Sequence, residues 1–143
     1  MIHRFKDENR WLSNMALVKI EFQGNTYSSV EHAYQSAKNK SQEWKDICIS
    51  EFNPYKIKIL SRDIEVREDW DEVKLLVMEE CLIEKFKQEP FKSQLLATGN
   101  ENIQEGNEWG DKFWGVDLTS SPNIGENHLG RLIMKTRENL REL

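Results

Sequence analysis

The chain has 143 residues, of which 38% are hydrophobic and 31% charged, and its formal net charge at pH 7 is −5. This length and composition predict one globular domain over residues 1–143 and exclude a disordered chain. The acidic balance argues against a nonspecific nucleic-acid binder, because such a protein needs a basic surface to neutralise phosphates. A small, locally basic pocket for one or two phosphates remains compatible with the charge.

The sequence favours a cytoplasmic protein. Cys48 and Cys81 are too few for a disulfide framework, and we expect reduced, buried thiols. No apolar run approaches the roughly 18 residues of a membrane span. The first ten residues, "MIHRFKDENR", lack the apolar region of a signal peptide.

The first predicted element is a small β-hairpin within residues 16–29, "ALVKIEFQGNTYSS". Leu17, Ile20 and Phe22 alternate with polar residues, and the "QGN" that follows has the composition of a tight turn.

A short helix is predicted next, within "YSSVEHAYQSAKNK", residues 27–40. Ser28 and Glu31 have the spacing of a capping box. One face of this helix is polar, since helical periodicity places four residues together: Glu31, Tyr34, Gln35 and Lys38. Two interpretations stay open: the face is a solvated exterior with Glu31 as a cap, or it lines a cleft that binds a ligand.

Four further helical segments are predicted, so the fold class is mainly α. They cover 43–52, 69–88, 91–99 and 127–143, whereas 54–63 reads as a helix or a short strand. Asp69 and Asn127 are the expected N-caps, and Leu76 is expected in the core stripe of the 69–88 helix. Residues 100–126 are predicted to form a long irregular loop, a kind of segment that is often functional.

Two motifs near the C-terminus are candidates for ligand contact. "EWGDKFWG", residues 108–115, holds three large aromatic side chains that need either the core or a ligand to cover them. "NIGENHLGR", residues 123–131, leads into a helix whose N-terminal amides suit a phosphate. Its glycines equally suit close helix packing.

Seven short motifs together resemble the NADAR family, whose members are also called YbiA-like proteins. They occur in the family's order over residues 5–141: "WLSN", "YSSVEHAYQSAK", "SRDIEVREDWDEVK", "MEECLIEKF", "LLATGN", "DKFWG" and "GENHLGRLIM". Three departures are Trp11 in place of a common Phe, Ile57 in place of a usual Ala, and Ser61 in place of a usual Gly.

The resemblance implies a compact, orthogonal helical domain of the YbiA-like type with a small N-terminal β-hairpin. It also implies cleavage of N-glycosidic bonds of ribose phosphates. One branch of the family resembles hydrolases of riboflavin-pathway ribosylaminopyrimidine intermediates. Other members act on ADP-ribose joined to nucleobases, including ADP-ribosylated guanine in DNA. The expected partner is a small ribose-phosphate or ADP-ribose substrate, with ADP-ribosylated nucleic acid as a further possibility.

Cutting a C1′–N bond develops positive charge on the ribose and requires proton transfer, which two carboxylates can serve. We expect Glu31 and Asp111 to converge on one cleft. Glu31 would activate water or support the cation, and Asp111 would hold the ribose hydroxyls or serve as acid–base partner, or the two roles would be exchanged. Lys38 would bind phosphate or tune the carboxylate, or alternatively attack C1′ of an opened sugar as a Schiff-base amine.

The remaining expected contacts bind substrate, and the chemistry requires no metal or other cofactor. They are Ser13, Asn14 and Gln35 for hydrogen bonds, Trp114 and then Trp70 for base stacking, Gly115 for close approach of the backbone, and Asn127, Gly130 and Arg131 as a phosphate seat. The competing hypotheses are a module that binds ADP-ribose-like nucleotides without turnover and a structural partner protein. The sequence does not predict the oligomeric state.

Overall fold

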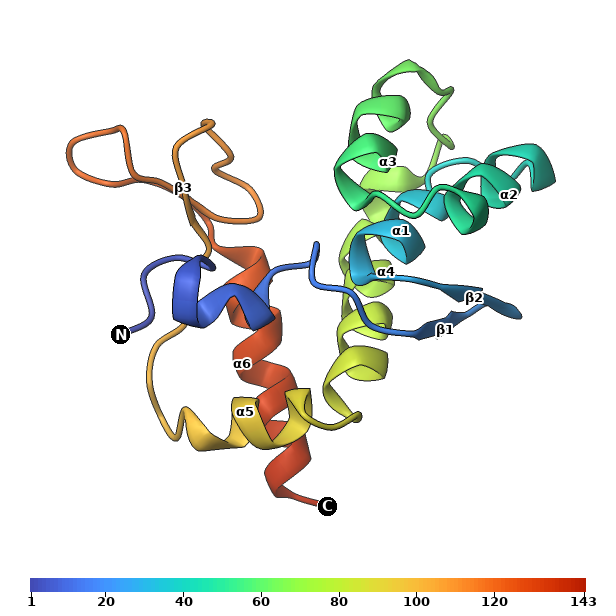
Figure 1. Ribbon diagram of the computed structural model, residues 1–143. Helices are drawn as coiled ribbons and strands as arrows, with labels where there is room; N and C mark the ends of the chain where they lie inside the picture. Colours follow the sequence, from blue (N-terminus) through green and yellow to red (C-terminus); the bar gives the residue numbers. More distant parts are fainter. The chain divides into compact units, whose positions relative to one another are not determined.

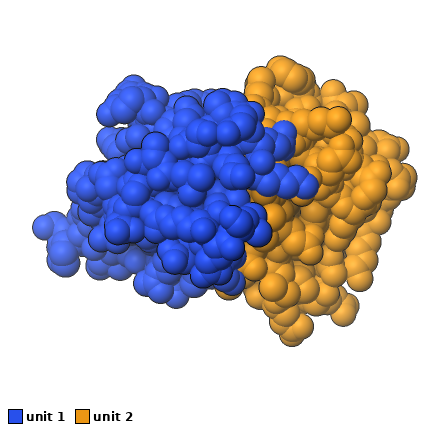
Figure 2. Space-filling view, turned by 90° about the horizontal axis from the view of Figure 1, so that it is seen from below, with its two compact units in different colours: residues 1–13, 86–143 blue, residues 14–85 orange.

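The computed structural model describes all 143 residues of the chain (Figure 1). Backbone contacts divide it into two compact units (Figure 2). Unit 1 comprises residues 1–13 and 86–143, and unit 2 comprises residues 14–85. Unit 1 is therefore built from both ends of the chain, and unit 2 from one continuous segment.

Unit 2 contains a hairpin and four α-helices. Its elements are β1 (Ile20–Phe22), β2 (Asn25–Tyr27), α1 (Val30–Ser36), α2 (Gln42–Ser50), α3 (Pro54–Leu60), the short 3₁₀ helix η2 (Ser61–Asp63) and α4 (Trp70–Phe86), whose last residue belongs to unit 1. The predicted hairpin is confirmed, with Ile20 opposite Tyr27 in an antiparallel pair. Gln23 and Gly24 both have positive φ, as a tight two-residue turn requires.

The segment after Pro54, left open between helix and strand, is the helix α3. Pro54 occupies its first turn, where the missing N–H costs no hydrogen bond, and the Asn53 side chain accepts the N–H of Tyr55 at 3.0 Å. Pro54, Ile57 and Ser61 are buried. Because they recur at helical spacing, they define the inner face of α3.

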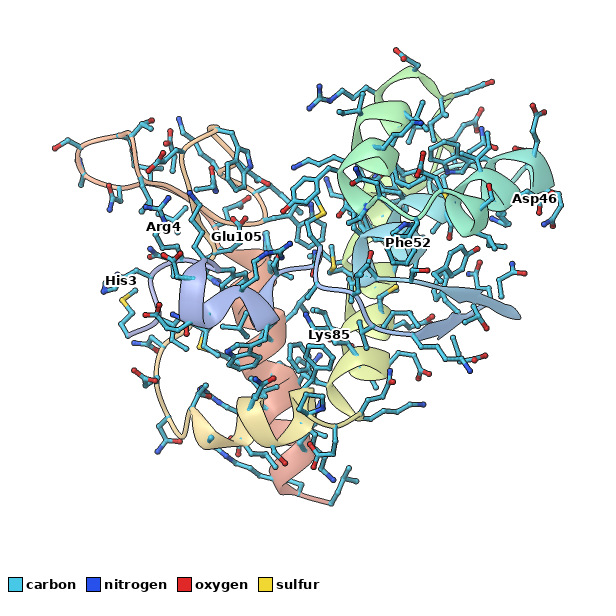
Figure 3. All side chains as sticks on the ribbon, viewed as in Figure 1. His3, Arg4, Asp46, Phe52, Lys85 and Glu105 are labelled. Atoms are coloured by element: carbon cyan, nitrogen blue, oxygen red, sulfur yellow. The ribbon has the colours of Figure 1, made fainter.

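The long helix α4 begins at Trp70, as predicted. Met78, Cys81 and Leu82 lie in its core stripe and Lys85 is fully buried near its end (Figure 3). The expected place of Leu76 in that stripe is wrong, since its side chain is 64% exposed. Leu76 lies on the opposite side of the helix from the buried positions.

Unit 1 holds the remaining elements: η1 (Asp7–Leu12), α5 (Phe91–Ala97), β3 (Gly106–Asn107), β4 (Val116–Asp117) and α6 (His128–Arg141). The loop between α5 and α6 is largely irregular, as predicted, but β3 and β4 form a short parallel pair within it. The Arg137 guanidinium joins α6 to the end of α5 through hydrogen bonds to Thr98 Oγ1 at 2.8 Å and the Glu101 carbonyl at 2.9 Å.

The predicted class, mainly α with an N-terminal hairpin, is confirmed. None of the helices combines the length and the apolar character needed to cross a membrane.

Candidate functional site

The polar face of α1 is buried rather than solvated. All residues from Val30 to Ser36 are buried, and Glu31 and Gln35 keep only 6% and 4% of their surface exposed. This favours the cleft-lining interpretation of the face over the exterior one.

The predicted capping box of α1 is wrong. Ser29, in an extended conformation, is the N-cap, and its Oγ accepts the N–H of His32 at 3.1 Å. Ser28 still belongs with the hairpin, because its carbonyl accepts the N–H of Val18 at 3.0 Å. Glu31 therefore has no capping duty, and its carboxylate can serve another purpose.

The Glu31 carboxyl group is held by its own helix. Its Oε1 accepts a hydrogen bond from Gln35 Nε2 at 2.8 Å, and its backbone N–H donates to the Asn14 carbonyl at 3.1 Å. Burial raises the pKa of Glu31, against the lowering effects of the Gln35 hydrogen bond and the charges of Lys58 and Lys38. A carboxyl group shifted in this direction is suited to proton transfer near neutral pH.

Two buried acceptors next to Glu31 lack a donor from the protein: Gln35 Oε1 and Asn14 Oδ1. Neither side chain is loose. Gln35 is tied to Glu31, its carbonyl accepts the Trp44 indole N–H at 2.7 Å, and the Asn14 amide contacts the Met78 sulfur at 3.6 Å. Unpaired buried acceptors are costly. They suit a ligand that brings hydroxyl or amino donors.

The prediction that Lys38 shares a helix face with Glu31 is wrong, because α1 ends at Ser36 and Lys38 lies in the turn that follows it. Its Nζ is 5.9 Å from the centre of the Tyr34 ring. Burial lowers the pKa of Lys38, the charge of Glu31 opposes this, and the like charges of Lys58 and Lys74 add to it. The ammonium is therefore in a region that disfavours its charge.

Lys58 of α3 and Lys74 of α4 were missed in the sequence. Each has a positional signal: Lys58 follows Pro54 by four residues on the inner face of α3, and Lys74 follows Trp70 by four residues on α4. Lys74 Nζ lies 3.1 Å from the Asp71 carboxylate, and its side chain is 21% exposed.

Trp70 forms part of the wall beside this face. Its indole is 8% exposed and packs against Tyr34, with ring centres 5.1 Å apart and ring planes tilted by 54°. A base stacked on Trp70 would have to meet the indole at a side that Tyr34 does not occupy.

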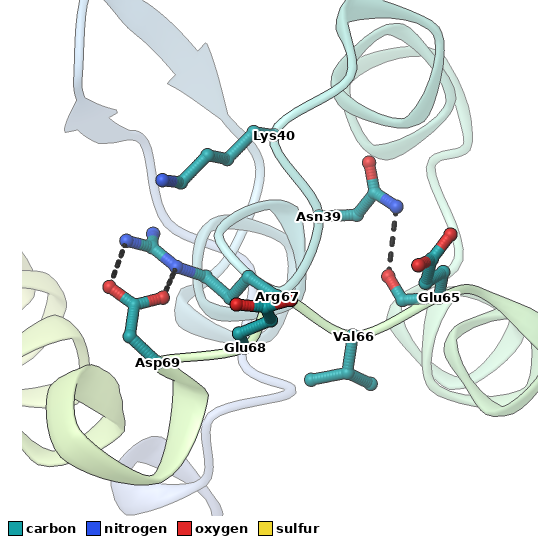
Figure 4. A pocket seen from close by; sticks show the side chains of 7 residues that line it. All are labelled: Asn39, Lys40, Glu65, Val66, Arg67, Glu68 and Asp69. Atoms are coloured by element: carbon teal, nitrogen blue, oxygen red, sulfur yellow. Dashed lines mark hydrogen bonds and ion pairs between the residues drawn. The ribbon is translucent and has the colours of Figure 1, made fainter.

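A cavity of about 390 Å³ lies in unit 2, and Glu31 is not among its lining residues (Figure 4). It is lined by Asn39, Lys40 and residues 65–69. The Arg67 guanidinium donates hydrogen bonds of 2.6 and 2.8 Å to the Asp69 carboxylate. Its charge is therefore already paired within the cavity lining. The lining holds three carboxylates against two cations, which does not favour an anion, so we place the candidate site at the α1 face.

Asp111, the second proposed carboxylate, organises its own loop in unit 1. Its Oδ1 accepts the backbone N–H groups of Phe113 at 3.1 Å and Trp114 at 2.9 Å. The Asn107 side chain holds the Asp111 backbone on both sides, accepting from its N–H and donating to its carbonyl at 2.9 Å each. These two contacts of Oδ1 fix the direction of the carboxylate.

The aromatic side chains of residues 108–115 differ in exposure. Trp114 is half-buried and meets Phe113 edge-on, with ring centres 4.9 Å apart. Phe113 also contacts the His128 ring at 4.5 Å, whereas Trp109 is 61% exposed. Loop packing thus accounts for Phe113, and base stacking on Trp114 stays a prediction.

The start of α6 is built differently from the prediction. Asn127 is at the N-cap position in a left-handed conformation, φ 54°, and its side chain does not cap the helix. It instead clamps the preceding loop, accepting from the Glu105 N–H and donating to the Ile103 carbonyl, both at 2.9 Å. The expectation of a capping side chain is wrong, because the left-handed backbone directs the amide to the loop.

Close packing explains both glycines of this region. A Cβ at Gly130 would lie 2.2 Å from the Ile103 carbonyl oxygen, and one at Gly115 would lie 2.0 Å from that of Glu105. Arg131 is exposed. A phosphate seat formed by Asn127, Gly130 and Arg131 stays a prediction.

The structure thus groups the predicted residues separately in each unit. In unit 2 it brings together Asn14, Glu31, Gln35, Lys38 and Trp70. In unit 1 it links Asp111 with Trp114 and Gly115 with Asn127, while Ser13 ends η1 with its N–H on the Arg10 carbonyl at 3.0 Å. The convergence of Glu31 and Asp111 on one cleft stays a prediction.

Comparison with known proteins gives these residues a family context. N-glycosidase Npun_R5314 of Nostoc punctiforme is 33% identical over 137 residues, 92% of this chain and 85% of that protein. N-glycosidase YbiA of Escherichia coli is 31% identical over 131 residues, 90% of this chain and 79% of that protein. The riboflavin biosynthesis protein VVA0006 of Vibrio vulnificus is 34% identical over 140 residues, which is 95% of this chain and only 37% of the Vibrio protein.

The fold has a solved counterpart. The NMR structure of the Escherichia coli protein YbiA matches with a TM-score of 0.84 at 29% identity, covering 99% of this chain and 83% of that one. The sequence model of the NADAR domain matches residues 2–141. With matches of this extent in both sequence and fold, the chain belongs to the NADAR family.

Proposed function

We propose that the protein is an N-glycosidase that hydrolyses the bond between ribose C1′ and a base nitrogen in phosphorylated N-ribosides. Relatives named N-glycosidase, at 31–33% identity over most of their length, support this class of reaction. The single observation that carries the proposal is the buried Glu31 carboxyl group, fixed by Gln35 beside unpaired acceptors and a partly buried lysine.

Two substrate classes fit the proposal. Ribosylaminopyrimidine phosphates of riboflavin synthesis are suggested by the name of the Vibrio relative, of which this chain spans 37%. ADP-ribose attached to guanine, free or in nucleic acid, follows from the family resemblance. Both contain a phosphorylated ribose whose C1′ is bonded to nitrogen.

In the proposed reaction the C1′–N bond breaks and its electron pair leaves with the base nitrogen, which takes up a proton. The ribose becomes oxocarbenium-like, and a water oxygen bonds to C1′ as the water loses a proton. Glu31 serves as the group that exchanges protons or supports the cation, because burial raises its pKa. Gln35 Oε1 and Asn14 Oδ1 accept hydrogen bonds from the ribose hydroxyls or the base.

Asp111 and Trp114 are the proposed contribution of the aromatic loop. Asp111 holds ribose hydroxyls or acts as the acid–base partner of Glu31, and Trp114 provides the surface on which the base stacks. Support comes from the rigid loop geometry, since Oδ1 of Asp111 is fixed by two backbone amides.

Glu31→Gln tests the proposal directly. The purified variant and the wild-type protein are incubated with ribosylaminopyrimidine phosphate and, separately, with ADP-ribosylated guanosine, and released base and sugar are quantified. We expect kcat to fall by about 10²–10⁴-fold, the usual contribution of a positioned acid–base group. Glu43→Gln is the matched control, because Glu43 is also in the first turn of a helix but is exposed.

Wild-type turnover by the Glu31 variant would refute its catalytic role. If the wild-type protein instead bound these compounds, raising Tm, but released no base, the protein would be a nucleotide-binding module rather than an enzyme.

A further inference from the structure

Helix α2 holds α1 near both of its ends. Close to the start of α1, Nε2 of His32 lies 2.7 Å from the carbonyl oxygen of Glu51, the C-cap residue of α2. Close to the end of α1, the carbonyl of Gln35 accepts the indole N–H of Trp44, in the first turn of α2, at 2.7 Å. The stretch of α1 that carries Glu31 and Gln35 is therefore fixed between two hydrogen bonds to the same neighbouring helix.

His32 is fully buried, and both of its ring nitrogens have partners. A carbonyl oxygen can only accept, so Nε2 carries the hydrogen that is donated to Glu51. Nδ1 lies 2.6 Å from the Ser29 hydroxyl, whose oxygen accepts the backbone N–H of His32 at 3.1 Å. That hydroxyl in turn donates its own hydrogen to Nδ1. The ring is therefore neutral with one fixed tautomer, in agreement with burial, which lowers the pKa of His32.

The Glu51 carbonyl is a fixed point for the His32 ring. The backbone N–H of Glu51 donates to the Ile47 carbonyl at 2.9 Å. The Glu51 carboxylate accepts the N–H of Asn53 at 3.2 Å and pairs with Lys56 at 2.9 Å, which ties the end of α2 to the start of α3. A helix of only seven residues, such as α1, has little stability by itself. Its orientation therefore depends on contacts with rigid neighbours of this kind.

Neither side chain has a polar group left for a substrate. Both nitrogens of His32 and the single N–H of the Trp44 indole are used within the protein. The two residues are 0% and 4% exposed. Any effect that they have on the reaction must therefore act through α1.

We propose that His32 and Trp44 are positioning residues of the candidate site, which hold α1 so that the Glu31 carboxyl group meets the substrate in the reactive geometry. The proposal rests on the proposed function for the reaction that Glu31 serves. Positioning of this kind matters for rate, because a displacement of about 1 Å in a reacting group can cost about 100-fold.

Kinetics on three substitutions test the positioning. Trp44→Phe keeps an aromatic ring but removes the N–H donor. His32→Gln keeps a donor that reaches the Glu51 carbonyl, whereas His32→Asn is too short for that contact and keeps only a polar group near Ser29. With the N-ribosyl substrates named above, we expect kcat to fall about 10- to 100-fold in Trp44→Phe and His32→Asn. KM should stay within about threefold of wild type in both, and His32→Gln should keep kcat within about threefold.

Titration of the Glu31 carboxyl group by NMR gives a readout that needs no substrate. Misplacing α1 would admit water to this group, so its pKa in Trp44→Phe and His32→Asn should fall from its raised value toward 4.5. Ile20→Val is the matched control, because Ile20 is fully buried in the same unit and has an apolar side chain. It should lower Tm but leave kcat and the Glu31 titration as in wild type.

Wild-type kcat and an unchanged Glu31 titration in both Trp44→Phe and His32→Asn would overturn the proposal. It would also be overturned if Ile20→Val lost as much kcat as these variants, or if His32→Gln were as impaired as His32→Asn. Should His32→Asn fail to fold, Trp44→Phe decides alone. A wild-type protein that releases no base, but whose Glu31 titration responds to Trp44→Phe and not to Ile20→Val, would retain the positioning and disprove only the N-glycosidase function.

Discussion

The amide of Gln35 donates to the carboxyl oxygen of Glu31 at 2.8 Å, one turn along α1, in a place where both side chains are almost wholly buried. On an exposed helix the residue four positions after a Glu is often a Lys, which pairs with the carboxylate and keeps it charged. Gln35 fixes the direction of Glu31 without a full neutralising charge. Burial can therefore dominate, and the pKa of Glu31 is raised.

The first prediction concerns the stability that the folded protein loses at neutral pH by burying the Glu31 carboxylate. Because the pKa of Glu31 in the folded protein is raised above its ordinary value of 4.5, its contribution to stability is present below about pH 4.5 and is lost as pH rises through the folded pKa. Glu31→Gln keeps an acceptor for Gln35 and removes the buried charge. At pH 7 we expect it to raise the free energy of unfolding by about 1 kcal/mol and Tm by about 2–4 °C.

Calorimetric Tm values at pH 4, 5.5 and 7 check this prediction, and the gain of the variant over wild type should grow across the series. Glu43→Gln serves as the control with no pH-dependent gain. A Glu31 variant that is less stable at pH 7 than at pH 4, relative to wild type, would show that the carboxylate is stabilised by its surroundings and that our account of the site is wrong.

The second prediction separates the two proposed roles of Lys38. If Lys38 acts by charge, Lys38→Arg should keep kcat/KM within about tenfold of wild type, while Lys38→Met should lower it about 100-fold or more. If the amine instead forms a Schiff base, both variants should be equally inactive, since guanidinium is not a nucleophile at this pH. We expect the first outcome, in which Lys38→Arg stays active and Lys38→Met does not.

Steady-state kinetics on the two substitutions provide the measurement, and cyanoborohydride reduction provides the control. A Schiff base reduced in the presence of ribose 5-phosphate would add the sugar phosphate to the Lys38 peptide in a mass spectrum. Detection of that adduct on wild-type protein would contradict the electrostatic role.

The sequence was sufficient for the parts of the fold that depend on local patterns. The hairpin, with Gln23 and Gly24 at its turn, and the end of α5 at Gly99, φ 61°, follow from residues that favour such backbones. The helical spacing of Glu31 and Gln35 also grouped them correctly on one face, whereas Lys38 lies in the turn after the end of α1. Whether that face is buried depends on what packs against it, which a local pattern does not specify.

Lys58 shows why part of the site was missed. In the sequence it stands in "PYKIKIL", where Lys56 and Lys58 look equivalent. Only the choice of helix over strand, and the packing of Ile57 against the interior, distinguish the inward lysine from the outward one. Site residues contributed by separate helices require tertiary contacts to be recognised.

The third prediction concerns Asp111, which has a structural duty as well as its proposed catalytic one. Asp111→Asn retains the side-chain oxygen that accepts from Phe113 and Trp114, so its Tm should stay close to that of wild type, while kcat falls by at least about 100-fold. Asp111→Ala loses both hydrogen bonds and should also lower stability by about 1–2 kcal/mol.

Unfolding and kinetic measurements on the two variants distinguish the structural role of Asp111 from its proposed catalytic role. Wild-type turnover by Asp111→Asn together with a destabilised Asp111→Ala would assign Asp111 to loop structure alone. In that case the chemistry would need a different partner for Glu31.

The fourth prediction concerns the contact between α6 and the loop before it. In an ordinary helix, Ala is more favourable than Gly by about 1 kcal/mol, but a Cβ at Gly130 would lie 2.2 Å from the Ile103 carbonyl oxygen and 2.5 Å from the Asn127 amide. The Ile103 carbonyl and the Asn127 side chain cannot easily move away from the added methyl group, because the Asn127 amide donates a hydrogen bond to that carbonyl at 2.9 Å. Gly130→Ala should therefore lower the free energy of unfolding by about 1–3 kcal/mol, the typical cost of overpacking.

Asn139→Ala provides the matched comparison, since Asn139 is exposed on the same helix and its replacement should be neutral or slightly stabilising. Urea unfolding of both variants gives the two free energies. If Gly130→Ala were as stable as Asn139→Ala, the loop would have to yield to the added methyl group, and Gly130 would be free to serve a ligand instead. A destabilised Gly130→Ala that still binds ribose 5-phosphate as tightly as wild type would show that this glycine is needed for packing, as the geometry at Ile103 requires.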